Sequence, residues 1–149
     1  MMQNLTPRQK DLRRGRFSQN NQIYHITTST LNRLPIFLSF DIAHIMVNVL
    51  KNSDALNHTQ TLSFVVMPDH IHWLFKLNLN QTLPHLIQRV KSVSAHALGQ
   101  TIWQAGYYDH AIRKDEDIQA IARYIIANPV RAGLVKKVGD YAHWDAAWM

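Results

Sequence analysis

The spacing of apolar residues divides this chain into an ordered series of strands and helices. Residues 22–30 are rich in β-branched and aromatic side chains, which predicts a first strand. Residues 60–67 and 70–77 predict two more strands, joined by a tight turn at Pro68-Asp69. A fourth, short strand is expected within residues 102–112.

Three other segments carry apolar residues at helical spacing. The first helix is predicted to begin at about Asp41, its expected N-cap, and to end among loop-forming residues between Asn52 and Asn57. The second is predicted over residues 82–98, and the third begins at Asp115 or Asp117. The residues expected to face inward are Ile42, Ile45, Met46, Val49 and Leu50 in the first helix, Leu83, Leu86, Ile87, Val90, Val93, Ala97 and Leu98 in the second, and Ile118, Ile121, Ala122, Ile125 and Ile126 in the third.

This order, β-α-β-β-α-β followed by a helix, is typical of an α+β fold of the ferredoxin-like split βαβ kind. We expect one antiparallel sheet with helices on one face, plus an additional C-terminal helix. Because there is no repeat, low-complexity tract or linker, residues 1–149 are expected to form a single domain. Residues 1–21 are interpreted as a basic N-terminal arm, and residues 142–149 as a short C-terminal tail.

Charge favours a polyanionic partner. The 149 residues include 16 Lys or Arg against 10 Asp or Glu, a formal net charge of +6. A basic protein without any nucleic-acid role remains an alternative. If the partner is nucleic acid, the candidate contacts lie in the arm, on the second helix and before the third helix: Arg13, Arg14, Arg16, Arg89, Lys91, Arg113 and Lys114.

Residue types and segments that the sequence lacks exclude several classes of function. There is no cysteine, which excludes disulfides, thiolate metal sites and cysteine catalysis. No apolar run approaches the ~20 residues of a membrane span, and the polar, basic N-terminus lacks the apolar core of a secretory signal. We therefore expect a cytoplasmic protein of bacterial type, without membrane partners.

His70 and His72 are the first candidates for chemistry. Side chains alternate between the two faces of a strand, so both imidazoles should point to one face, with Ile71 opposite. Two fixed histidines can supply two ligands to one metal ion. Any strand can carry two histidines by chance, so the pair alone leaves metal binding open. The other histidines show no comparable pairing and are expected to be structural or superficial: positions 25, 44, 58, 85, 96, 110 and 143.

Tyr124 and Asn128 are the second candidates, because their spacing of four residues puts them on one side of a helix. Both fall at the edge of the apolar stripe, where a side chain can reach toward the sheet. The Asn128 side-chain oxygen could be a third, neutral metal ligand. Pro129 disfavours helical conformation at Asn128 and predicts that the helix ends or kinks there. The alternatives are a half-buried core tyrosine and an ordinary helix-terminal asparagine.

Several segments together resemble a known family. They are residues 65–75 (Val-Val-Met-Pro-Asp-His-Ile-His-Trp-Leu-Phe), Trp103-Gln104, residues 109–113, and residues 124–135 (Tyr-Ile-Ile-Ala-Asn-Pro-Val-Arg-Ala-Gly-Leu-Val). In this order they resemble the REP-associated tyrosine transposases, a branch of the single-tyrosine HUH transposases of insertion sequences. The likeness covers nearly the whole chain, from the first strand to about residue 141, and is much more specific than either motif alone.

The resemblance implies roles for four residues. His70 and His72 match the metal ligands, Tyr124 the nucleophile on the C-terminal helix, and Asn128 the third metal ligand. The implied cofactor is a divalent metal, Mg²⁺ or Mn²⁺. No matched position is missing, although members with longer C-terminal tails exist, so any function of such a tail is in doubt.

The implied activity is cleavage and rejoining of single-stranded DNA beside hairpins of repetitive extragenic palindromes, through a 5′-phosphotyrosine. Such a protein would work at the nucleoid, as a monomer by analogy with its branch, with a dimer as the alternative. Two other hypotheses remain open on the residues: a non-catalytic DNA hairpin-binding protein, and a small metallohydrolase that uses the histidine pair with an activated water.

Overall fold

A computed structural model describes residues 22–147, and its centre is a five-stranded antiparallel sheet. The strands are β1 (Ile23–Ser29), β2 (Thr59–Val66), β3 (His70–Leu77), β4 (Tyr108–Ala111) and β5 (Trp144–Ala146). The main helices are α2 (Phe40–Ala55), α3 (Leu83–Leu98), α4 (Ile118–Ile126) and α5 (Asn128–Arg131). The predicted basic arm, with Arg13, Arg14 and Arg16, lies outside the described residues.

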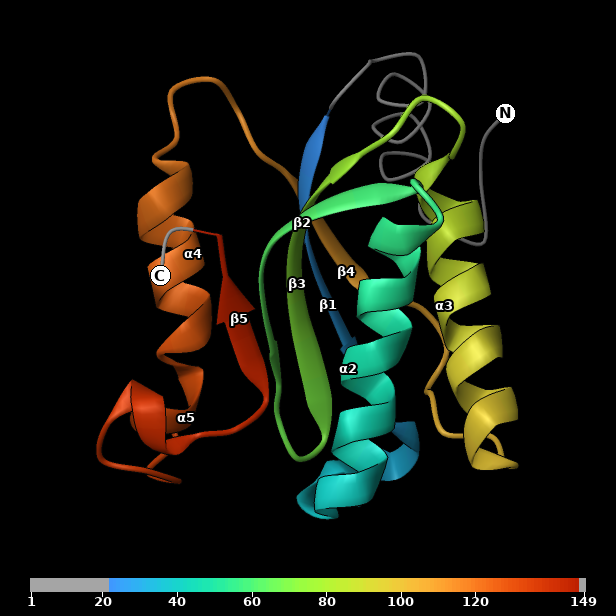
Figure 1. Cartoon of the computed structure of the whole chain (residues 1–149), viewed down its shortest axis with the longest axis vertical. Coiled ribbons are helices and arrows are strands. Elements are labelled where there is room, and N and C mark those ends of the chain that lie inside the picture. Colours follow the sequence, from blue (N-terminus) through green and yellow to red (C-terminus); the bar gives the residue numbers. More distant parts are fainter. Residues whose placement is uncertain (1–21, 148–149) are drawn as a thin grey trace.

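The strand order across the sheet is β4-β1-β3-β2-β5, so β3 is central (Figure 1). β2 and β3 form the predicted hairpin, and β1 pairs with β3 on the other side. β1 also pairs with β4, which puts the two halves of the chain into one sheet. The predicted α+β class and antiparallel sheet are confirmed by this topology.

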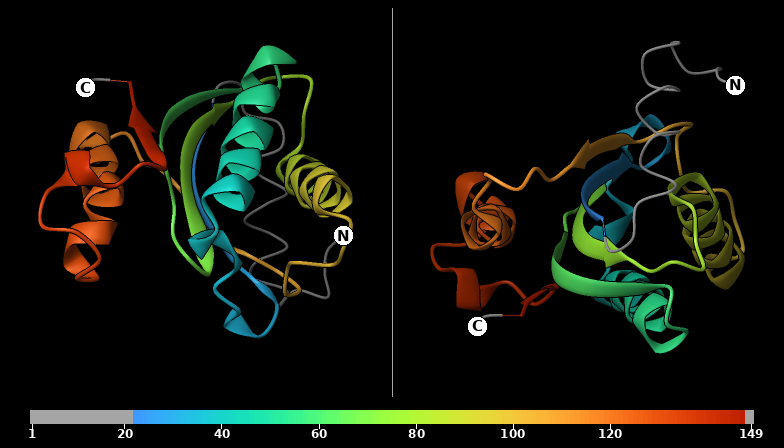
Figure 2. Two further views of the ribbon diagram at one scale, coloured as in Figure 1. Left: turned by 60° about the horizontal axis from the view of Figure 1, so that its bottom comes forward. Right: turned by 90° about the horizontal axis from the view of Figure 1, so that it is seen from above.

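α2 and α3 cover one face of the sheet (Figures 1 and 2). Alternation along β3 turns Ile71, Trp73 and Phe75 toward these helices, where all three are almost completely buried. Burial of such large side chains is the main driving force for closing this layer. His70 and His72 occupy the alternate positions of the strand and therefore face the opposite side of the sheet.

α4 lies on that opposite face (Figure 2). Leu74 of β3 and Val65 of β2 pack with Ala122 and Ile125 of α4 in a second buried cluster. The buried Ser63 Oγ donates a hydrogen bond to the Ala122 carbonyl oxygen at 3.1 Å. These contacts hold α4 beside the strand that carries the histidines.

The N-terminal caps of two helices can be compared with the predictions. α2 begins at Phe40 and its N-cap is Ser39, whose Oγ accepts a hydrogen bond from the Ile42 N–H, so the predicted Asp41 cap is wrong. Serine and aspartate both make good caps, and the sequence pattern does not separate them. For the third helix Asp117 is the cap, because its Oδ1 accepts from the Ala120 N–H.

The burial of the helices differs from the predicted stripes at a few positions. In α2, Ile42 and Ile45 are only half-buried, while Ala43 and Val47 are buried instead. In α3, Ala97 is exposed. The inward faces are therefore rotated slightly from the stripes that apolar spacing alone predicts.

The C-terminal part of the described chain contains a break between two helices and a short edge strand. α4 ends at Ile126, and a separate turn, α5, begins at Asn128 with Pro129 in its first turn, which confirms the predicted break. Residues Trp144–Ala146, which the sequence pattern treats as tail, form β5 on the edge beside β2. Within residues 22–147, no helix combines the length and hydropathy needed to cross a membrane.

Candidate functional site

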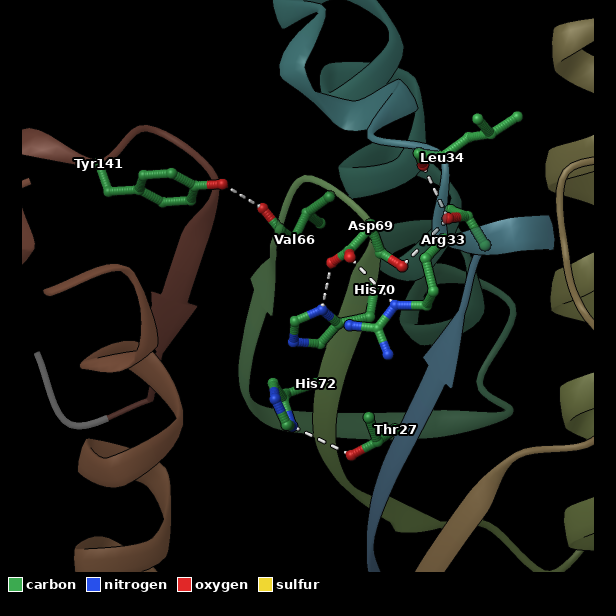
Figure 3. Close-up of polar contacts among 9 residues, drawn as sticks. Thr27, Arg33, Leu34, Val66, Asp69, His70, His72 and Tyr141 are labelled. Atoms are coloured by element: carbon green, nitrogen blue, oxygen red, sulfur yellow. Dashed lines mark hydrogen bonds and ion pairs between the residues drawn. The ribbon is translucent and has the colours of Figure 1, made fainter. Parts of the chain in front are cut away.

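The paired histidines lie side by side on the face of the sheet that α4 shares (Figure 3). Their ring centroids are 5.0 Å apart, and the ring planes are nearly perpendicular. Both side chains are partly buried. The predicted same-face arrangement of His70 and His72 is therefore confirmed.

His70 is oriented by the residue before it. Its Nδ1 is 2.7 Å from Oδ1 of Asp69, and Arg33 Nε donates to Asp69 Oδ2 at 3.0 Å (Figure 3). Burial alone would raise the pKa of Asp69, but the hydrogen bonds from His70 and Arg33 outweigh it and hold the pKa below its usual value. An ionised carboxylate can only accept, so Nδ1 of His70 is the donor in this hydrogen bond, and Nε2 is the ring nitrogen left for a ligand.

His72 is oriented from the neighbouring strand. Its Nδ1 is 3.1 Å from Thr27 Oγ1 and 3.1 Å from His25 Nε2, both on β1 (Figure 3 shows the Thr27 contact). His25, which the sequence assigns only a structural or surface position, therefore has a structural contact with His72. Because these contacts occupy Nδ1, Nε2 is again the nitrogen left for a ligand.

Burial disfavours the charged forms of His72 and His25. Burial, together with charge repulsion from His25, His70 and Arg131, lowers the pKa of His72 to about 3. Burial, with His110 nearby, lowers the pKa of His25 to about 4. A neutral imidazole is the form that binds a metal ion, so the environment of His72 suits a ligand role.

Tyr124 lies at the solvent-facing side of α4 and is 61% exposed. This exposure contradicts the alternative of a half-buried core tyrosine. The guanidinium carbon of Arg131 lies 3.6 Å from the centroid of the Tyr124 ring. The ring is thus covered on one face by a cation from α5, the short helical segment that follows α4 after Ala127.

Asn128 sits at the start of α5, and its Nδ2 donates to the Ile125 carbonyl oxygen at 2.8 Å. That contact uses the amide nitrogen and leaves Oδ1 as an acceptor. Among residues 22–147, no group of three or more His, Cys, Asp and Glu side chains is arranged to hold a metal ion. The Asn128 side-chain oxygen is of a kind suited to Mg²⁺ or Mn²⁺.

The predicted DNA contacts on α3 lie on the helix layer across the sheet from the histidines. Lys91 Nζ donates to the carbonyl oxygens of Gly106 at 2.6 Å and Gln104 at 3.0 Å, and burial lowers the pKa of Lys91. This ammonium therefore ties α3 to the segment before β4. Arg89, close enough to His58 to lower its pKa, lines an open hollow with His85 and Gln88.

The two candidates before α4 are exposed. Arg113 Nε donates to Asp115 Oδ1 at 3.3 Å, and Lys114 follows it in the same loop. DNA contact by all of these basic residues stays a prediction.

Comparison with known proteins shows the family. The family model described as "Transposase IS200 like" matches residues 18–128, which include both histidines, Tyr124 and Asn128. The chain therefore belongs to the IS200-like transposases.

Individual relatives agree with that assignment. A REP-associated tyrosine transposase of Escherichia coli K12 is 35% identical over 81 residues, 53% of this chain and 49% of the relative. A putative REP-associated tyrosine transposase of Haemophilus influenzae is 28% identical over 100 residues, 56% of this chain and 57% of that protein. The matched part of this chain thus spans about half the length of each relative.

Two solved structures share the fold. One is a REP-associated tyrosine transposase bound to a REP hairpin, with a TM-score of 0.69 and 26% identity, covering 85% of this chain and 77% of the other. The second is a putative transposase from Deinococcus radiodurans, with a TM-score of 0.56 and 18% identity. The match covers 74% of this chain and 93% of the other, and it supports the fold alone.

Four residues at the site were not among those predicted: His25, Thr27, Asp69 and Arg131. Alternation along β1 puts His25 and Thr27 on one face, which was visible in the sequence. Their contact with His72 depends on the register between β1 and β3, in which Thr27 is paired with His72. That register is set by tertiary packing and not by any local pattern.

Proposed function

We propose that this protein is a metal-dependent endonuclease and strand transferase that cleaves and rejoins single-stranded DNA beside REP-type hairpins. Tyr124 is the proposed nucleophile and a 5′-phosphotyrosine the intermediate. The observation that carries the proposal is the pair His70 and His72, each with Nδ1 engaged and Nε2 free, on the face against which the Tyr124 helix packs.

The residues present fit a divalent metal. Nε2 of His70 and Nε2 of His72 are the proposed nitrogen ligands, and Oδ1 of Asn128 the proposed oxygen ligand. Bound there, Mg²⁺ or Mn²⁺ would polarise a phosphoryl oxygen of the scissile phosphate. Asp69, Thr27 and His25 have the supporting role, since hydrogen bonds to the remote nitrogen fix the orientation of a ligating imidazole.

The proposed chemistry at Tyr124 is a transesterification. The phenolic oxygen attacks the phosphorus, a new Tyr–O–P bond forms, and the bond from phosphorus to the 3′ oxygen breaks. The phenol loses its proton to solvent, and the departing 3′ oxygen takes one up to become a free 3′-OH. Attack of a 3′-OH on the phosphotyrosine reverses the step and joins strands without an external energy source.

The substrate class follows the relatives. The Escherichia coli relative is named REP-associated, and the solved structure with 26% identity holds a REP hairpin. The formal charge of +6 suits any DNA partner. We propose that this chain acts on hairpins of that kind as a monomer, in the bacterial cytoplasm at the nucleoid.

The test is a covalent adduct on denaturing gels. Wild-type protein with Mn²⁺ and a labelled single-stranded hairpin oligonucleotide should give a protein-linked strand, and a chelator should prevent it. Tyr124→Phe should abolish the adduct. Tyr108→Phe is the matched control, because Tyr108 is equally exposed at 62% but lies on β4.

The rival functions give different results in the same assay. A non-catalytic hairpin-binding protein, favoured only by the net charge, would bind the hairpin in chelator and never cleave it. A metallohydrolase using an activated water would release products without a protein-linked strand and would tolerate Tyr124→Phe. An undiminished adduct in Tyr124→Phe would refute the nucleophile assignment.

A further inference from the structure

The guanidinium of Arg131 stacks on the Tyr124 ring. The guanidinium carbon is 3.6 Å from the ring centroid, the distance of direct stacking. The two residues belong to different helical segments, α4 and α5, which join at Ala127. Tyr124 is mostly exposed, so this stacking restrains a ring that otherwise faces solvent.

The same arginine shares a helical turn with the proposed oxygen ligand of the metal. Arg131 follows Asn128 by three residues within α5, and residues three apart lie on one side of a helix. Arg131 therefore lies between the ring of the proposed nucleophile and the helix face that carries Asn128. It lies beyond residues 18–128, the part of the chain that the family model matches.

The geometry points to Arg131 as a positioning residue for the proposed reaction: its guanidinium face holds the Tyr124 ring, and its N–H edge receives an oxygen of the scissile phosphate. This role rests on the proposed function, because it needs a phosphate between Tyr124 and the histidine pair. Stacking uses the flat face of the guanidinium and leaves the in-plane N–H donors free. Those donors are suited to a phosphate oxygen.

The proposed role needs both the charge and the planar shape of the guanidinium. Substitution by glutamine or by lysine removes one of these properties at a time. Glutamine keeps a planar polar end but has no charge. Lysine keeps the charge but has no planar group to stack on the ring. Arg131→Gln and Arg131→Lys should therefore fail in different ways.

The first readout is strand cleavage under single-turnover conditions at saturating hairpin. Arg131→Gln should slow adduct formation on the order of 100-fold, the cost of a misplaced reacting group. Arg131→Lys should slow it by about 10-fold, since the charge remains. Hairpin affinity, measured in a Tyr124→Phe background, should stay within about threefold of its starting value, because one phosphate contact is a small part of the interface.

The second readout needs no DNA and no activity. The Arg131 charge opposes a divalent cation at His70 and His72, so Arg131→Gln should bind Mn²⁺ more tightly. For a separation on the order of 10 Å in a water-like dielectric, the gain is about threefold. Arg131→Lys should leave Mn²⁺ affinity unchanged. Free Mn²⁺ can be counted by electron paramagnetic resonance.

Arg123→Gln is the matched control, because it removes the same charge from an exposed arginine adjacent to Tyr124 in sequence. Slower cleavage together with tighter Mn²⁺ binding in Arg131→Gln, and not in Arg123→Gln, supports the assignment. A cleavage rate within about twofold of wild type, or Mn²⁺ affinity that is unchanged or weaker, overturns it. Failure of the proposed function is read separately, as the absence of any adduct in the wild type.

Discussion

Acidification should destabilise the metal-free protein, because the fold holds two neighbouring histidines neutral. Burial lowers the pKa of His72 to about 3 and that of His25 to about 4, from 6.5 in an unfolded chain. Below pH 6.5 the unfolded chain takes up protons that the folded protein does not. Protonation then favours unfolding, so stability is lost as the pH falls from 6.5 toward the folded pKa values.

The magnitude follows from the size of these shifts. Each histidine that is charged only in the unfolded state costs about 1.4 kcal/mol per pH unit below 6.5, or about 2 kcal/mol by pH 5. Both side chains retain some solvent contact, which screens their charges. We therefore expect a loss of roughly 2–4 kcal/mol from the pair together between pH 7.5 and pH 5.

Urea unfolding in the presence of a chelator measures this loss. His58 and His143 also have pKa values lowered mainly by burial, so they add to the pH dependence of every variant. The comparison that isolates the pair is His25→Gln, which removes one titrating group and one positive charge that opposes protonation of His72. It should lose at least half of the pair's contribution.

His96→Gln, at an exposed position on α3, controls for loss of a histidine elsewhere and should keep the wild-type pH dependence. Equal stability of the wild type at pH 7.5 and pH 5 would refute the reasoning. So would a His25→Gln variant whose pH dependence matches that of the wild type.

Three further variants test other parts of the structure. Ile125→Ala should lower the free energy of unfolding by about 2–4 kcal/mol, because Ile125 is fully buried between α4 and the sheet; the half-buried Ile121→Ala should cost less, and an equal cost would contradict this packing. Asp69→Asn should weaken Mn²⁺ binding by about tenfold in calorimetry, since it alters the acceptor of His70; unchanged affinity would contradict the orienting role. Lys91→Met should cost about 1–2 kcal/mol of stability and leave the salt dependence of hairpin binding unchanged, and a salt slope smaller by about one would show instead that Lys91 contacts a phosphate.

The order of strands and helices was predictable because each long element carries an unmistakable period. The β2–β3 hairpin and α3 fall within a residue or two of the predicted ranges. β5 was missed because three residues are too short to show alternation, and its pairing with β2 is purely tertiary. The start of α2 was missed because Ser39 and Asp41 are both ordinary capping residues.

The site was predictable in part. Strand alternation was sufficient to turn His70 and His72 to one face. Helical spacing put Tyr124 at the edge of the apolar stripe and left a half-buried position open, which its 61% exposure then excluded. The contacts of His72 with His25 and of Tyr124 with Arg131 were not predictable. The first depends on cross-strand register, and the second on the conformation at Ala127, where α4 ends and α5 begins.

The central claim is that Tyr124 becomes covalently bound to the 5′ side of a cleaved DNA strand. Mass spectrometry of the protease-digested adduct tests it most directly, by locating the residue that carries the nucleotide. The expected result is a phosphodiester-linked nucleotide on Tyr124 and a released strand ending in a 3′-OH. A nucleotide on any other residue, or cleavage that leaves every tyrosine unmodified, would contradict it.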